Sequence, residues 1–248
     1  MVLSRTTEIT LSTILGAFRE VRLGEPHPVF GGGAVHVPES LATELDDEAR
    51  GELTQLGLSD RRGRVTDEFE DALYALGQAD TEYFARYHGE ERHYSVLVAT
   101  RGHNTVTAVV AGEKVWVKAE DSRQSPAAVL VANLPASRPA QLTTISLSQQ
   151  ELRGEDSDDP GDRSRTARTV DALLNQPASG RGEVNVAVRE QGWHRQEVGG
   201  VLLFRDLAEG RALFELSGPA QNRYVTVMPG EDQLFVRKVA ALRASWGS

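Results

Sequence analysis

The sequence predicts an α+β protein that contains a duplicated antiparallel β-meander. The apolar residues follow a helical period in the first third of the chain and a period of two from residue 82 onward. A succession of four candidate strands and a closing helix then occurs twice. The two copies predict a pseudo-twofold fold with helices packed on the sheet.

The first third contains three expected helices. Leu11, Ile14, Leu15 and Phe18 form one apolar stripe, which ends at the prolines of residues 24–28. A second stripe follows Pro38 and comprises Leu41, Leu45, Ala49, Leu53 and Leu56. Gly57 stands where a left-handed helix cap is expected. Thr66, followed by Asp67 and Glu68, is typical of the N-cap of a third helix.

Four strands are expected next, joined by short connections that contain glycine. They cover Glu82–Tyr87, His93–Thr100, Thr105–Ala111 and Val115–Lys118. The connections 101–104 and 112–114 are short enough for antiparallel hairpins. A helix from about Ser125 to Leu134 closes this first copy.

The same order returns in the second half of the chain. The expected strands are Glu183–Arg189, Val201–Asp206, Arg211–Ser217 and Tyr224–Met228, and a helix follows through Leu234, Phe235, Val239 and Leu242. The fourth strands, 115–117 and 225–227, lie 110 residues apart. We expect one domain over residues 1–248 with a first unit of about 1–135 and a second of about 136–248; the alternative is a chance similarity of two meanders.

The stretch between the copies contains an acidic segment without large apolar residues. We expect a flexible loop at about 154–164, because such a composition cannot bury enough apolar surface to fold. The alternating aspartates and the fixed glycine of a calcium loop are missing from it. A helix is expected from about Arg165 to Asn175.

Composition excludes several classes of function. The 248 residues carry a net charge of −9 and show no basic face, so we expect no nucleic acid partner. Without a cysteine, neither disulfides nor thiolate chemistry is possible. The longest apolar run, 127–134, is too short to cross a bilayer, and no signal peptide is visible. We therefore expect a cytoplasmic protein without membrane insertion.

No residues in the sequence form a recognisable catalytic, metal or cofactor motif. The six histidines lack the helical spacing of a zinc site, and His88 and His93 flank an expected turn. The glycines at 31–33 lack the context of a phosphate-binding loop, and a nucleophile elbow is missing. We expect no catalytic residues, no metal and no cofactor, so the protein is predicted not to be an enzyme.

Binding of another protein requires exposed aromatic or apolar side chains on a rigid platform. A meander with helices on one side can leave its other face free. The candidate partner-binding residues are Trp116, Phe204, Phe214, Tyr224, Phe235 and Val239. Each aromatic ring of the strands is more often a core residue than a contact, so one or two exposed rings would be the anchors. The expected oligomeric state is a monomer or a weak homodimer.

Several stretches taken together resemble a known family. They are Leu23-Gly-Glu-Pro-His-Pro-Val, Leu53-Thr-Gln-Leu-Gly-Leu-Ser-Asp-Arg-Arg-Gly-Arg-Val-Thr, and the repeated unit of strands and helix. In their order and spacing they resemble the EspG family, the type VII (ESX) secretion-associated chaperones of actinobacteria. The resemblance covers essentially the whole chain, but the 101–104 hairpin is shorter than the long loop expected of members that grip a partner with it.

The resemblance implies a non-enzymatic cytosolic chaperone with a central antiparallel sheet and N- and C-terminal helical bundles. Such a protein binds a helical secretion substrate, a PE–PPE heterodimer or a PPE-like or WXG-like protein, keeps it soluble and delivers it to its secretion system. Two alternatives stay open at this point. One is an interaction module of the same fold with a different partner, and the other is a small-molecule or enzymatic role in an α+β pocket.

Overall fold

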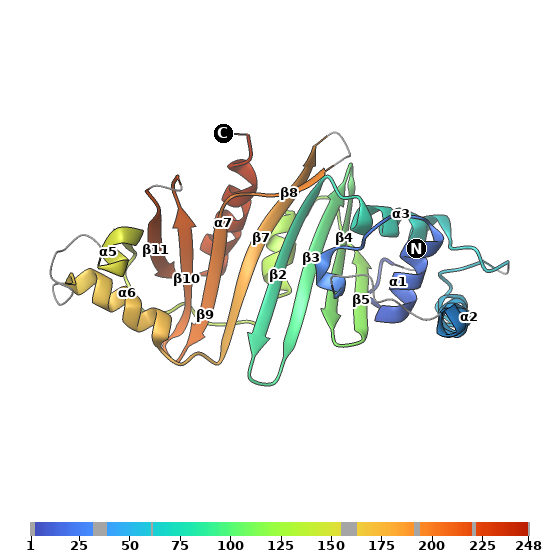
Figure 1. Cartoon of the computed structure of the whole chain (residues 1–248), viewed down its shortest axis with the longest axis horizontal. Coiled ribbons are helices and arrows are strands. Elements are labelled where there is room, and N and C mark those ends of the chain that lie inside the picture. Colours follow the sequence, from blue (N-terminus) through green and yellow to red (C-terminus); the bar gives the residue numbers. More distant parts are fainter. Residues whose placement is uncertain are drawn as a thin grey trace. The chain divides into compact units, whose positions relative to one another are not determined.

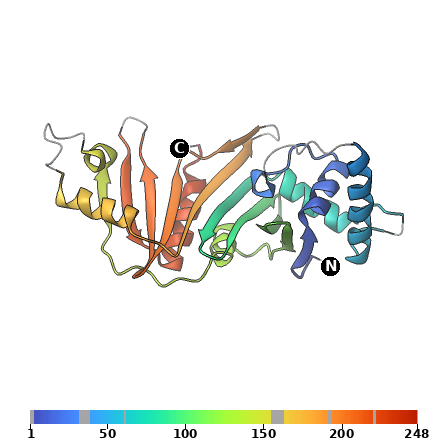
Figure 2. The same ribbon diagram turned by 60° about the horizontal axis from the view of Figure 1, so that its bottom comes forward.

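The computed structural model describes residues 3–31, 39–60, 62–154, 163–190, 194–219 and 222–247 (Figures 1 and 2). They form two compact units. The first comprises Met1–Arg86, His93–Asn133 and Val186–Glu197, and the second comprises Tyr87–Arg92, Leu134–Asn185 and Val198–Ser248. Most of the acidic loop expected at 154–164 lies outside the described residues.

The meander of the first unit has the order β1-β5-β4-β3-β2. Its strands are β1 (Thr7–Thr10), β2 (Thr81–Gly89), β3 (His93–Arg101), β4 (Asn104–Ala111) and β5 (Lys114–Ala119). Each of the last four lies within two residues of the range that the period of two predicts. The short strand β8 (His194–Glu197) also belongs to this unit and was not expected.

The helices of the first unit are α1 (Leu11–Glu20), α2 (Glu39–Gln55), α3 (Asp67–Gly77) and α4 (Pro126–Ala132), with a 3-10 turn at Pro28–Phe30. Thr66 caps α3 as expected, because its hydroxyl accepts the N–H of Phe69. Gly57 ends the second apolar stripe with a φ of 70°.

Helices lie on both faces of the first meander. Leu97 and Ala99 of β3 belong to the core that contains α1 and α3. The alternating residues Val96 and Val98 point to the other face, where α4 packs on β3. Helices therefore pack on both faces of these strands, because both faces carry apolar residues, and the free face that the sequence allowed for is not found on β3.

The second unit repeats this plan with the strand order β7-β9-β10-β11-β6. Its elements are β6 (Ile145–Ser148), α5 (Gln149–Arg153), α6 (Arg165–Asn175), β7 (Gly180–Glu190), β9 (Val201–Leu207), β10 (Gly210–Ser217), β11 (Tyr224–Pro229) and α7 (Asp232–Ala244). Of β7, the residues up to Asn185 belong to this unit and those from Val186 onward to the first. The predicted strands and both predicted helices are confirmed, whereas β6 and α5 were not expected.

The duplication is larger than the sequence pattern indicates. In each unit a short strand pairs with the last strand of the meander, β1 with β5 and β6 with β11. A helix follows each short strand at once, capped by the hydroxyl of Thr10 in the first unit and of Ser148 in the second. The repeated unit is therefore strand, helices, four-stranded meander and closing helix.

Two helices also cover the second meander from opposite faces. Phe214 and Val227 pack in a core with Ala167 and Val170 of α6. The neighbouring residue Leu213 points to the other face, on which α7 packs against β9.

Candidate partner-binding surface

Four of the six predicted partner-binding residues are buried within the chain itself. Phe204, Phe235 and Val239 are 0% exposed and Phe214 is 3% exposed. The rings of Phe204 and Phe235 lie 5.5 Å apart, centroid to centroid, between β9 and α7. These residues stabilise the second unit and are not available as surface anchors in this conformation.

Tyr224 is the predicted residue with the most accessible side chain. It is 42% exposed, at the start of β11 and opposite Ser148 of the short strand β6. Two residues further on, Thr226 shares a hydrogen bond of 3.0 Å with Ser146. The ring therefore stands beside a polar strip at one edge of the second meander, on the face that α7 covers only in part.

Trp116 holds a similar place in the first unit. It lies on β5 opposite Glu8 of β1, and its indole N–H donates to Glu8 Oε2 at 3.0 Å. The other oxygen of Glu8 lies 2.7 Å from Lys114 Nζ. This hydrogen bond to Lys114 lowers the pKa of Glu8, so the carboxylate stays charged and holds the half-buried indole in place.

The strand registers show that Tyr224 and Trp116 occupy nearby, but not identical, positions of the repeated unit. Lys114 lies opposite the capping residue Thr10, and Tyr224 lies opposite the capping residue Ser148. The position of the first unit that is equivalent to Tyr224 is therefore Lys114, and Trp116 lies two residues further along β5. Each unit presents one aromatic ring beside its short edge strand.

Leu203 is an exposed apolar side chain that sequence reasoning missed. It is 39% exposed on β9 and pairs across the sheet with Phe214 of β10. Phe214 faces α6, so Leu203 lies on the face of the second meander opposite to Tyr224. Alternation along the strand could not identify it, because the neighbours of Leu203 are apolar too.

The first unit also contains a buried polar cluster that the sequence did not predict. The Glu82 carboxylate accepts from Arg195 Nε at 2.6 Å and lies 3.5 Å from both Arg189 Nη2 and His27 Nε2. Burial, then the nearby Arg195, lowers the pKa of His27 to about 3, and burial raises the pKa of Glu82. The neutral His27 ring accepts the N–H of Val29 at its Nδ1 atom. These contacts fix the turn after α1.

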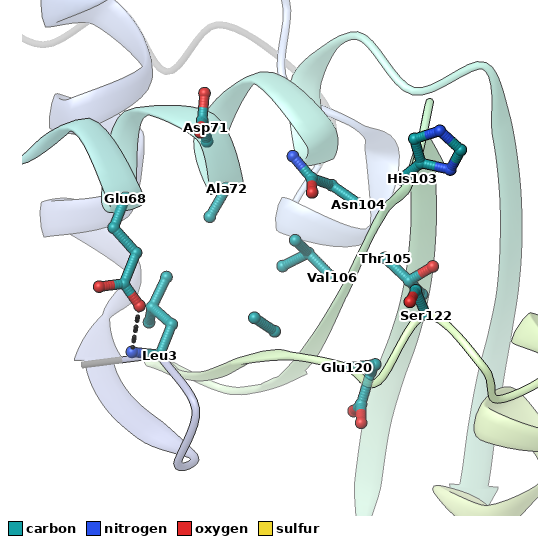
Figure 3. A pocket seen from close by; sticks show the side chains of 11 residues that line it. Leu3, Glu68, Asp71, Ala72, His103, Asn104, Thr105, Val106, Glu120 and Ser122 are labelled. Atoms are coloured by element: carbon teal, nitrogen blue, oxygen red, sulfur yellow. Dashed lines mark hydrogen bonds between the residues drawn. The ribbon is translucent and has the colours of Figure 1, made fainter. Parts of the chain in front are cut away.

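Two cavities of the first unit are lined mainly by polar side chains of α3, β4 and the segments that follow β3 and β5. The one in Figure 3 has a volume of about 390 Å³ and is lined by Glu68, Asp71, His103, Thr105 and Glu120, among others. Within the described ranges, no three His, Asp or Glu side chains are placed to hold a metal ion. In that same part of the chain, no helix is both long and apolar enough to cross a membrane.

Comparison with known proteins identifies the family. A family model described as the EspG family matches residues 10–241. The fold resembles that of the type VII secretion system chaperone EspG5 of Mycobacterium tuberculosis, solved in complex with a PE25–PPE41 dimer. The TM-score is 0.73 at 16% identity, over 98% of each chain. A search of curated proteins finds no match. The family resemblance of the sequence is confirmed: this chain belongs to the EspG family.

Proposed function

We propose that this chain is a cytoplasmic, non-enzymatic chaperone of type VII secretion that binds a helical PE–PPE heterodimer. The family match over residues 10–241 carries this proposal. It is supported by the likeness in fold, over 98% of both chains, to a chaperone solved with such a dimer. The chaperone would keep the substrate soluble and deliver it to its secretion system.

The chemistry of a helix-pair tip suits such a partner surface. Helix ends carry amide and carbonyl groups without intrahelical partners, and the tip of a helix pair also presents apolar side chains. Aromatic side chains with a polar end can cover both kinds of group, and they dominate the energy of many interfaces. Tyr224 beside the hydroxyls of Ser146 and Ser148, and Trp116 beside Glu8, offer this combination.

Of the predicted contact residues, we infer that Tyr224 and Trp116 contribute directly to partner binding. Phe204, Phe235 and Val239 would act by holding the sheet and α7 together beneath the surface, and Phe214 by holding the sheet and α6 together.

Co-expression with a PE–PPE pair encoded in the same genome tests the function. The substrate is expected to remain in the soluble fraction and to co-purify with the chain, and to precipitate without it. If no PE–PPE pair co-purifies and a different class of protein is captured instead, the chaperone proposal is wrong.

A matched pair of variants tests the surface. Tyr224→Glu is expected to weaken the complex at least tenfold, because a buried carboxylate without a partner is costly. Leu203→Glu places the same charge at a similarly exposed position on the opposite face of the same unit and is expected to bind normally. Equal affinities of the two variants, both folded by circular dichroism, would contradict this assignment of the surface.

A further inference from the structure

Two arginines stand directly opposite each other on one face of the second meander. Arg181 of β7 pairs in register with Arg205 of β9. Leu203 lies two residues before Arg205 on the same strand and points to the face of α6, so both arginines point to that face as well. Side chains paired in this way have Cβ atoms about 5 Å apart, and like charges there destabilise a sheet. The pair is therefore not explained by the stability of the fold.

Neither guanidinium has a carboxylate as its partner in the described part of the chain. Arg205 Nη2 donates to the carbonyl of Gln176, just beyond the end of α6. Arg205 Nε is buried, and no described residue accepts its N–H. Arg181 is exposed and forms no ion pair with a described residue. One arginine is thus fixed in place, and the other is accessible from solvent.

The carboxylates on this side of the unit are bonded to amides instead. Glu183 follows Arg181 by two residues on the same face, and its Oε1 accepts from Asn185 Nδ2 at 2.7 Å. Glu209, in the turn after β9, accepts from Gln176 Nε2 at 2.9 Å. The hydrogen bonds of both arginines to an anion are therefore left unused.

The next strand shows how the same unit holds an arginine that belongs to its core. Arg211 of β10 donates from Nε and from Nη2 to the two carboxylate oxygens of Asp206, at 2.7 and 3.0 Å. That guanidinium is buried with its counter-ion. Arg181 and Arg205 differ from it in having no such anion.

The first unit places an anion at the equivalent position. The residue before β2 and the residue before β7 each donate an N–H to the neighbouring strand, at Thr100 in the first unit and at Asp206 in the second. Glu82 and Arg181 are each the second residue of these strands and are therefore equivalent. The Glu82 carboxylate lies against two guanidiniums. The second unit has two guanidiniums here and no anion from its described residues.

The chemistry of two opposed guanidiniums favours an oxyanion with two charges. A guanidinium presents a planar fork of N–H donors that matches carboxylate and phosphate oxygens. A phosphoryl group carries nearly two negative charges at neutral pH and has three strong acceptor oxygens. It can therefore neutralise both arginines and accept from both at once.

We propose that Arg181 and Arg205 bind a phosphoryl group between them. Arg205 is the fixed half of the site, because the carbonyl of Gln176 holds one of its nitrogens. Arg181 is the mobile half and closes on the anion from the solvent side. Inorganic phosphate and a phosphorylated side chain of another protein share this chemistry. The proposal goes beyond the chaperone function and does not rest on the PE–PPE surface at Tyr224 and Trp116.

The test follows the arginine side-chain Nε–H signals of the full-length ¹⁵N-labelled chain by NMR. Sodium phosphate is added at about pH 8, where the phosphoryl group is doubly charged, and sodium chloride of equal ionic strength is the reference. We expect saturable shifts of the Arg181 and Arg205 signals with a dissociation constant below about 10 mM. A short peptide that carries phosphoserine distinguishes the sources. Tighter binding of the peptide supports a phosphorylated partner, and tighter binding of inorganic phosphate supports a free anion.

Four variants sharpen the test. Arg181→Gln and Arg205→Gln should each weaken phosphate binding at least tenfold. Arg168→Gln, at an exposed position of α6, should leave it unchanged. Glu183→Gln should strengthen binding, because it removes a negative charge beside the site. Arg181→Gln should also raise the melting temperature at low salt, since the repulsion between the two arginines is lost.

Other results overturn the proposal. They include the absence of a saturable shift at tens of millimolar phosphate, an equal shift with chloride, and equal affinities of Arg181→Gln and Arg168→Gln. A lower melting temperature of Glu183→Gln, without tighter binding, would show that Glu183 is itself the counter-ion of Arg181. Phosphate binding that appears only when the carboxylates of residues 155–162 are replaced by amides would show that the chain's own acidic segment occupies the site.

Discussion

The guanidinium of Arg211 and the carboxylate of Asp206 form a two-fold hydrogen bond inside the second unit. Arg211 Nε donates to Oδ1 at 2.7 Å and Nη2 donates to Oδ2 at 3.0 Å. The same guanidinium lies 4.7 Å from the ring centroid of Phe204 and donates to the carbonyl of Pro135. One buried cation thus joins β9, β10 and the chain that enters this unit.

Asp206→Asn is expected to lower the free energy of unfolding by about 3–5 kcal/mol, because it leaves the Arg211 charge buried without a counter-ion. Urea denaturation measures this change. Asp171→Asn is the matched control in the same unit, since Asp171 is a half-exposed partner of Arg163, and its effect should stay below about 1 kcal/mol. Similar losses in the two variants would show that the buried pair contributes no more than a surface pair.

The His27 cluster predicts a loss of stability in mild acid. The pKa of His27 is about 3 in the folded chain and about 6.5 in the unfolded one. Above pH 6.5 the ring is neutral in both states, so it contributes no pH dependence. As the pH falls from 6.5 towards 3, only the unfolded state gains the proton, and stability decreases by up to about 1.4 kcal/mol per pH unit. Glu82 opposes this trend in part, because its raised pKa favours proton uptake by the folded state.

His27→Asn isolates this contribution, because asparagine can still accept the N–H of Val29. Its free energy of unfolding should fall less steeply than that of the wild type between pH 6.5 and 5. Parallel slopes would mean that His27 is accessible to protons in the folded state.

Gly210 is expected to resist substitution by alanine. Its φ is +125°, and an added Cβ would lie 2.5 Å from the carbonyl oxygen of Arg138. Gly210→Ala should therefore lower the free energy of unfolding by more than about 1 kcal/mol. Gly102→Ala is the control: φ is +56° there, but no atom lies within 4 Å of the added Cβ. If both variants lose the same stability, the close approach of residues 138–139 is not what requires Gly210.

Phe235 is expected to contribute to the stability of the fold and not to make direct contact with the partner. Phe235→Ala removes a fully buried ring that packs on Phe204. It should cost about 3–5 kcal/mol of stability. Thermal denaturation checks this, and Gln233→Ala on the exposed side of α7 should leave the melting temperature nearly unchanged. A normal melting temperature together with lost PE–PPE binding would return Phe235 to the partner surface.

The spacing of apolar residues and the residues that cap helices were sufficient to predict most of the helices and strands. Apolar residues at every second position placed the two meanders, and the caps Thr66 and Gly57 placed helix ends, because these signals act within a few residues. The short strands β1 and β6 were not predicted, because they carry no such local signal. Each has four residues and one buried side chain, Ile9 or Leu147, so no period is visible. Pairing with strands about 80 to 110 residues away makes them strands.

The sequence by itself determined the class of the protein: its duplicated α+β pattern and its resemblance to the EspG family are both readable from local signals and their order. Only the tertiary structure decided which aromatic side chains are exposed. Phe204 and Tyr224 both lie on predicted strands, yet α7 packs over the first and leaves the second accessible. Which ring a helix covers depends on contacts between distant segments, and alternation along a strand assigns faces only when the packing side is known.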